Sequence, residues 1–90
     1  MKQNKVYLTP VRISEGQFSN EKAVVLMCSD GTETSGFIEK SKIKQGKLEV
    51  DVIKEEDGLV LIKLPCRMLE PPGDKGYLTV QKSNLKYSPQ

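Results

Sequence analysis

Hydrophobic and polar residues alternate along several short segments of this chain, and a two-residue period is typical of β-strands that bury one face. The clearest case is the segment 47–52, in which hydrophobic residues occupy the even positions. The segment 6–13 alternates as well, but its hydrophobic residues change parity after Pro10. Because proline cannot donate a ladder hydrogen bond, we expect an edge strand that is bent or bulged at Pro10.

Two further segments, Ala23–Cys28 and Leu59–Leu64, are almost continuously hydrophobic. Such runs are typical of strands that are buried on both faces. Proline and glycine interrupt every window that is long enough for an amphipathic helix, so the only helical element we expect is one turn at 40–43. The remaining expected elements are strands at 32–39 and 77–81 and turns at Ser29–Gly31 and Asp57–Gly58.

The chain also repeats itself at an offset of 42 residues. Residues 2–16 read KQNKVYLTPVRISEG, and residues 44–58 read KQGKLEVDVIKEEDG. The corner Lys40–Ile43 recurs as Lys82–Leu85 at the same offset. The second strands of the two copies align at an offset of 36, so the first copy has about six additional residues before its second strand. Loops accept insertions of this length readily.

This repetition predicts the architecture. We interpret it as an internal duplication with copies at about 2–43 and 44–86, each of which supplies three strands. Three strands cannot bury a hydrophobic face alone, whereas two facing copies can. We therefore predict a single all-β domain over residues 1–90, a small six-stranded barrel or sandwich with pseudo-two-fold symmetry. The alternative is a five-stranded SH3-like barrel, which needs a strand after the corner at 83–85, where we expect Tyr87–Gln90 to be frayed.

Composition limits the function classes. The chain has 90 residues, with 14 lysines and arginines against 12 aspartates and glutamates, and the charges are interspersed. This balance differs from that of a dedicated nucleic-acid-binding protein. The longest apolar run, Ala23–Cys28, has six residues, so we expect neither a membrane span nor a signal peptide, and we expect a cytoplasmic protein. Cys28 and Cys66 suit a reducing compartment, and we expect them to be buried thiols.

Catalytic chemistry has little support. Histidine is absent, so neither a Cys–His nor a Ser–His pair can form. Two cysteines 38 positions apart do not supply the four ligands of a usual zinc site. We therefore predict a protein that is not an enzyme and has no cofactor. An enzyme that relies on carboxylates or on a lysine alone is the remote alternative, and Lys63, the one lysine we considered for that role, is expected to face solvent.

Our leading hypothesis is a non-catalytic interaction module that binds a protein partner or a second copy of itself as a homodimer. The expected contact surface is the loop Pro65–Gly76, through Arg67, Met68 and Leu69, since an exposed Met-Leu pair beside an arginine suits a protein interface. A loop that folds back to cap the barrel is an equally weighted alternative. Phe18, alone in a polar loop, is expected to plug the end of the core.

The second hypothesis is weak binding of nucleic acid or another polyanion through lysine clusters at pseudo-symmetric positions. Scarce arginine, the absence of tryptophan and tyrosines that are not interleaved with lysines count against it. The candidate residues are Lys40, Lys42, Lys44, Lys82 and Lys86.

Overall fold

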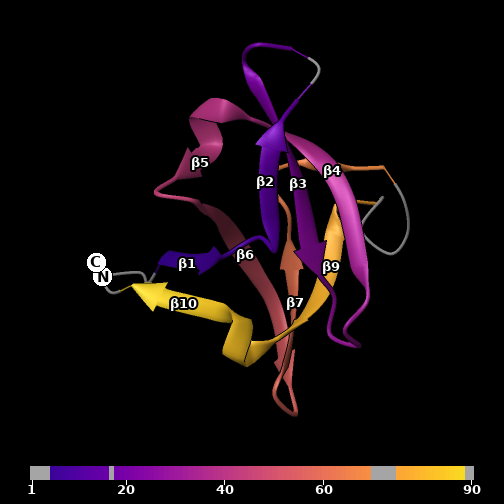
Figure 1. The fold of residues 1–90 in the computed structure, drawn as a ribbon. Coiled ribbons are helices and arrows are strands. Elements are labelled where there is room, and N and C mark those ends of the chain that lie inside the picture. Colours follow the sequence, from indigo (N-terminus) through magenta and orange to yellow (C-terminus); the bar gives the residue numbers. More distant parts are fainter. Residues whose placement is uncertain (1–4, 17, 70–74, 89–90) are drawn as a thin grey trace.

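The computed structural model describes residues 5–16, 18–69 and 75–88. Within these ranges the protein is all-β, with two antiparallel sheets and the single-turn 3-10 helices η1 (Lys40–Lys42) and η3 (Lys82–Asn84) (Figure 1). The strands are β1 (Lys5–Leu8), β2 (Arg12–Glu15), β3 (Glu21–Met27), β4 (Glu33–Glu39), β5 (Ile43–Lys44), β6 (Lys47–Glu56), β7 (Leu59–Lys63), β8 (Arg67–Met68), β9 (Tyr77–Gln81) and β10 (Leu85–Ser88). The predicted all-β class and the helical turn at 40–43 are confirmed.

The strands form two sheets that do not join into a closed barrel. One sheet has the order β10-β1-β6-β7-β9, with β5 beside the start of β6, and the other has the order β2-β3-β4-β8. The chain changes sheet between β1 and β2, at Pro10, which confirms the predicted bend. The predicted edge position is right for β2 but wrong for β1, which pairs with β10 on one side and β6 on the other. Two hydrogen bonds link the sheets on the other side: Ser29 N donates to Thr79 O (2.9 Å), and Gln81 Nε2 donates to Ser29 O (2.7 Å).

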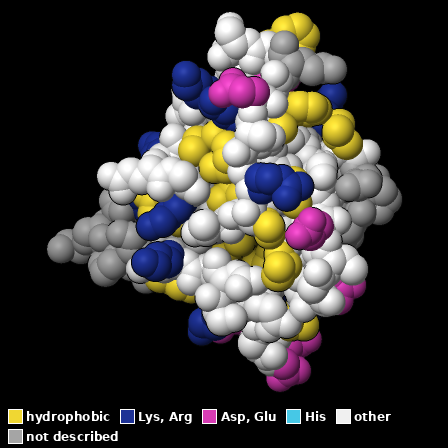
Figure 2. Space-filling model, in the orientation of Figure 1, with side chains coloured by type: hydrophobic (Ala, Val, Ile, Leu, Met, Phe, Trp, Pro, Cys, Tyr) yellow, Lys and Arg dark blue, Asp and Glu magenta, His cyan; other side chains and the backbone are white. Residues whose placement is uncertain are grey.

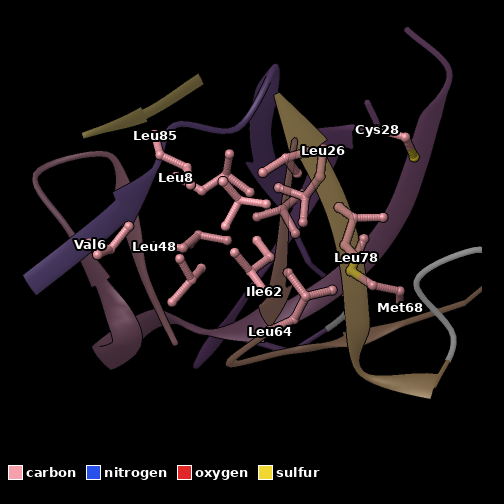
Figure 3. Packing of buried hydrophobic residues seen from close by; sticks show 14 of the residues in the cluster. Val6, Leu8, Leu26, Cys28, Leu48, Ile62, Leu64, Met68, Leu78 and Leu85 are labelled. Carbon is pink, nitrogen blue, oxygen red and sulfur yellow. The ribbon is translucent and has the colours of Figure 1, made fainter. Parts of the chain in front are cut away.

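Both sheets contribute to one hydrophobic core (Figure 3). Leu8, Leu48 and Ile62 enter it from the first sheet, and Leu26 and Met68 enter it from the second. Burial of each such side chain stabilises the fold by about 1.5–3 kcal/mol. The core also contains Val6, Val24, Cys28, Ile38, Val50, Val60, Leu64, Leu78, Val80 and Leu85.

The two continuously hydrophobic strands are buried on one face only, so the prediction of burial on both faces was wrong. In β3, Leu26 is fully buried whereas Met27 is 38% exposed. In β7, Ile62 is fully buried whereas Leu59 is 37% exposed. The reason is the two-layer architecture, in which each sheet has one face against the core and no further layer covers the other face.

Glycine-containing turns connect the strands, at Ser29–Gly31 and Asp57–Gly58 as the sequence predicted and also at Gln45–Gly46, which was not predicted. The hairpin between β6 and β7 turns at Asp57–Gly58, whose φ angles are 54° and 79°. Gln45–Gly46 joins β5 to β6 with φ angles of 55° and 77°. Positive φ at both central residues matches the right-handed twist of the flanking strands. At the turn Ser29–Gly31, Asp30 Oδ1 accepts hydrogen bonds from the backbone N and the side-chain Oγ1 of Thr32. These hydrogen bonds also lower the pKa of the Asp30 carboxyl.

The register of the first two strands is the same in both copies, whereas that of the second and third strands is not, because Val24 faces Gly36 but Val60 faces Val80 rather than Leu78. Ile13 of β2 pairs with Val24 of β3, and Glu55 of β6 pairs with Val60 of β7. Glu55 lies 42 residues after Ile13, and Val60 lies 36 residues after Val24, which are the offsets at which the two copies align in sequence. The helices η1 and η3 are also 42 residues apart, and each follows an extended residue.

Tyr87 and Ser88, which were predicted to be frayed, belong to a strand. Instead of fraying, residues 85–88 form β10, which pairs with β1 and places Tyr87 opposite Val6. The strand that we expected to be missing after the corner at 83–85 is therefore present. Lys2, where the first copy begins, and Pro89–Gln90 lie outside the described residues. No helix in the described ranges has the length and hydrophobicity needed to cross a membrane.

Candidate functional site

A groove of about 700 Å³, called the apolar groove below, opens beside the end of β4. The loop before β3 supplies Phe18, the end of β4 supplies Phe37, and the segment after β7 supplies Leu64 and Leu69. The groove is also lined by Glu21, Ile38, Glu39, Lys42, Pro65, Cys66 and Arg67.

Two hydrophobic side chains in this groove face solvent. Phe18 is 67% exposed and Leu69 is 63% exposed, the highest fractions among the large hydrophobic residues described as exposed. The prediction that Phe18 plugs the core was wrong. Phe18 lies in the turn before β3, where Glu21 N donates to Phe18 O (3.2 Å), while Leu64 and Met68 fill the nearby part of the core.

The pairing of strand β8 with β4 determines which of the predicted contact residues are exposed. It pairs Met68 with Gly36 and Arg67 with Phe37, and Leu69 N donates to Ser35 O (2.9 Å). Because neighbouring residues of a strand point to opposite faces, Arg67 is exposed while Met68 is only 3% exposed. Arg67 and Leu69 therefore line the apolar groove, whereas Met68 belongs to the core. The prediction of an exposed Met-Leu pair was wrong. Residues 70–74 of the predicted contact loop lie outside the described residues.

The charges around the apolar groove are balanced. Two acidic residues, Glu21 and Glu39, and two basic residues, Lys42 and Arg67, line it. Lys42 Nζ also lies 3.5 Å from Pro65 O, as a hydrogen-bond donor. The groove thus combines exposed apolar surface with both signs of charge, a composition common at protein interfaces.

The two cysteines behave as small hydrophobic residues. Cys28 is buried and Cys66 is half-buried, and both are free thiols. Burial raises the pKa of Cys66 to about 11, against the weaker opposing effect of Lys42. Cys66 Sγ contacts Met68 Sδ at 3.6 Å. At neutral pH Cys66 is therefore a neutral thiol that adds apolar surface to the groove.

A second groove, of about 460 Å³, brings together two of the five predicted polyanion-binding lysines. We call it the lysine–tyrosine groove. Lys44 and Lys86, which occupy equivalent positions in the repeated sequence, both line it. Its described lining is Tyr7, Lys44, Gln45, Lys47, Lys86 and Tyr87.

The structure places the other three predicted lysines elsewhere. Lys40 lies in a separate hollow near Asn20, and Lys42 lines the apolar groove. Lys82 Nζ donates to Glu55 Oε2 (2.7 Å), and this hydrogen bond raises the pKa of Lys82. The predicted clusters are therefore divided among different surfaces.

The predicted site residues did not include Lys47, Tyr7 and Tyr87. Tyr7 pairs across the sheet with Lys86 on one side and with Glu49 on the other, and Lys47 pairs with Lys44. Tyrosines and lysines are therefore not interleaved along the sequence, but they are neighbours in the sheet. In Figure 2, basic side chains gather on the left, over the region where Figure 1 draws β1, β5 and β10.

Among the described residues, no group of three or more histidine, cysteine, aspartate or glutamate side chains is arranged to hold a metal ion. Comparisons of the chain with models of protein families, with curated proteins and with solved structures found no match.

Proposed function

We propose that this chain is a non-catalytic interaction module that binds a second copy of itself through the apolar groove. The observation that carries the proposal is the exposure of Phe18 and Leu69 on one groove. Transfer of a phenylalanine or leucine side chain out of water is favourable by about 1.5–3 kcal/mol. A partner that covers both side chains would gain this free energy, which supports a protein-binding role.

The balance of charge favours a second copy as the occupant. A two-fold symmetric interface places the same patch on both subunits, so the patch must complement itself. With Glu21 and Glu39 facing Lys42 and Arg67 of another copy, acids can meet bases. A partner of a single charge sign would leave one of these pairs unmatched. A standard interface buries roughly 800 Å² on each partner, about an eighth of this chain's 5985 Å² surface.

Sedimentation equilibrium tests the proposal over concentrations from about 1 μM to about 1 mM, the range in which weak interfaces dissociate. We expect a monomer–dimer equilibrium. Phe18→Ser and Leu69→Ser should each weaken the dimer by roughly 10-fold to 100-fold, as loss of a central hydrophobic contact does.

Ile53→Ser is the matched control, because Ile53 is 51% exposed and lies on β6, outside the groove. It should leave the dimer constant nearly unchanged. A monomer across the whole range, or equal weakening by Ile53→Ser, would overturn self-association through this groove.

We further infer that the two halves of the chain are copies of one three-strand unit. The recurring register, with Ile13 opposite Val24 and Glu55 opposite Val60, supports this origin, as do the matched η1 and η3 turns. The presence of β10 after η3 supports the competing prediction of an SH3-like barrel, because that fold needs a strand after this corner. An experimental structure in which residues 5–43 fail to superpose on 47–85 would refute the duplication.

A further inference from the structure

The lysine–tyrosine groove has a charge distribution unlike that of the apolar groove. Lys44, Lys47 and Lys86 line it, and its described lining contains no acidic residue. The ion pairs found in the described part of the chain involve Lys22, Lys54 and Lys82, and none involves these three residues.

Strand pairing places the three lysines around one groove. Lys44 and Lys47 are directly opposite across the β5–β6 hairpin, an unfavourable arrangement for like charges. Lys86 lies opposite Tyr7 on the neighbouring strands. The nearest acid in these strand pairs is Glu49, which lies opposite Tyr7 but does not line the groove. An anion bound between the lysines would relieve their repulsion.

Two tyrosines in the groove indicate which kind of anion it binds. Tyr87 is 40% exposed and Tyr7 is half-buried, and both line the groove beside the lysines. Aromatic rings beside a basic groove are the combination that binds single-stranded nucleic acid, in which lysines contact phosphates and bases stack on rings. The volume of about 460 Å³ is within the range of small-ligand sites.

We infer that the lysine–tyrosine groove binds a short stretch of single-stranded nucleic acid. An acidic peptide could satisfy the lysines but offers no bases to the tyrosine rings. Duplex binding needs an extended basic face, whereas this chain has a net charge of only +2.

The first test is fluorescence anisotropy with a labelled oligothymidylate of about ten nucleotides, which exceeds the smallest single-strand site sizes. Neutralisation of three phosphates predicts a slope near −2 for log K against log salt concentration, since single strands contribute about −0.7 per phosphate. Binding that does not depend on salt concentration would overturn the inference.

Charge-reversal variants locate the site. The double variant Lys44→Glu/Lys86→Glu removes two groove lysines, and Lys54→Glu/Lys63→Glu changes net charge equally at exposed positions outside the groove. We expect the Kd to rise tenfold or more for the first and about twofold or less for the second, because screening limits long-range charge effects. An equal loss in both would assign the binding to net charge alone and contradict the groove.

A base-free probe tests the role of the rings. An abasic deoxyribose-phosphate chain of the same length should bind at least about fivefold more weakly than oligothymidylate, since each stacked base contributes measurably. Tyr7→Ser should weaken binding, whereas Tyr7→Phe, which keeps the ring, should not. Tyr77→Ser is the control, because Tyr77 is 44% exposed and does not line this groove. Equal affinity for the abasic chain, or equally strong competition by oligoglutamate, would overturn the inference.

Discussion

Gly36 on β4 is the residue whose replacement most directly tests how the apolar groove is built. It pairs with Met68 of β8, and the two backbones approach closely. A Cβ atom at position 36 would collide with the carbonyl oxygen of Arg67, and it would lie 2.6 Å from Met68 Sδ and 2.8 Å from Met68 Cα. The side chain of Met68 could move, but the backbone atoms of β8 could do so only by leaving β4. We therefore predict that Gly36→Ala displaces β8.

The sign of the change in unfolding free energy distinguishes a close contact at Gly36 from an ordinary Gly→Ala replacement. Where the backbone accepts alanine, Gly→Ala stabilises by about 0.4–1 kcal/mol because the unfolded chain loses freedom. Forcing additional volume into a packed site costs about 1–3 kcal/mol. With two backbone contacts below van der Waals distance at Gly36, the second effect should dominate. A net loss of about 2 kcal/mol corresponds to a fall in Tm of roughly 8–16 °C for a domain of this size.

Urea denaturation followed by circular dichroism measures this change. The neighbouring Ser35→Ala is the control, because Ser35 contributes its backbone carbonyl, not its side chain, to the bond with Leu69 N. It should change the free energy of unfolding by no more than about 0.5 kcal/mol. Unchanged or increased stability of Gly36→Ala would refute the close β4–β8 contact, and with it the placement of Arg67 and Leu69 in the groove.

Three further predictions concern single side chains. The rate of Cys66 alkylation, measured in a Cys28→Ala background, should rise with a pH midpoint near 11. The free energy of unfolding should fall as pH rises from the ordinary thiol pKa towards that value, because the Cys66 thiol ionises first in the unfolded chain. A midpoint at the ordinary thiol pKa would show that the Cys66 thiol is solvated. The hydrogen bond from Lys22 lowers the pKa of Glu15, so its stabilising effect is present above the ordinary carboxyl pKa of 4.5 and is lost as pH falls through the lowered value. An NMR titration in which Lys22→Ala leaves the Glu15 pKa unchanged would contradict this pairing. Ile62→Ala, at a fully buried position, should destabilise by about 2–5 kcal/mol in urea denaturation, and a loss below about 1 kcal/mol would place Ile62 outside the core.

Local patterns in the sequence predicted much of the fold. The parity change at Pro10, the turn at Asp57–Gly58 and the corner at 40–43 all have counterparts in the structure. Each depends on short-range chemistry: the missing proline N–H, positive φ in a hairpin, and a brief helical turn. Strand β10 alternates in polarity over only the four positions Leu85–Ser88, and it was missed because its stability comes from pairing with β1, about eighty positions away.

The candidate sites depended on contacts that local patterns do not contain. The burial of Met68 and exposure of Arg67 follow from the register of β8 against Gly36. Phe18 reaches the apolar groove through the packing of a loop against the segment after β7, which is more than forty residues away. Tyr7 could have been found, since strand alternation places it on the same outward face as Lys5, but its pairing with Lys86 required the sheet order.

In the proposed dimer, Phe18 and Leu69 contact a second copy of the chain. Isotope-filtered NMR on an equal mixture of carbon-13-labelled and unlabelled protein measures contacts between copies directly, at concentrations near 1 mM where weak dimers form. We expect intermolecular NOEs between the Phe18 ring and groove protons such as the Leu69 methyl groups. A dimer whose intermolecular NOEs arise only from other surfaces, or a sample without such NOEs, would contradict it.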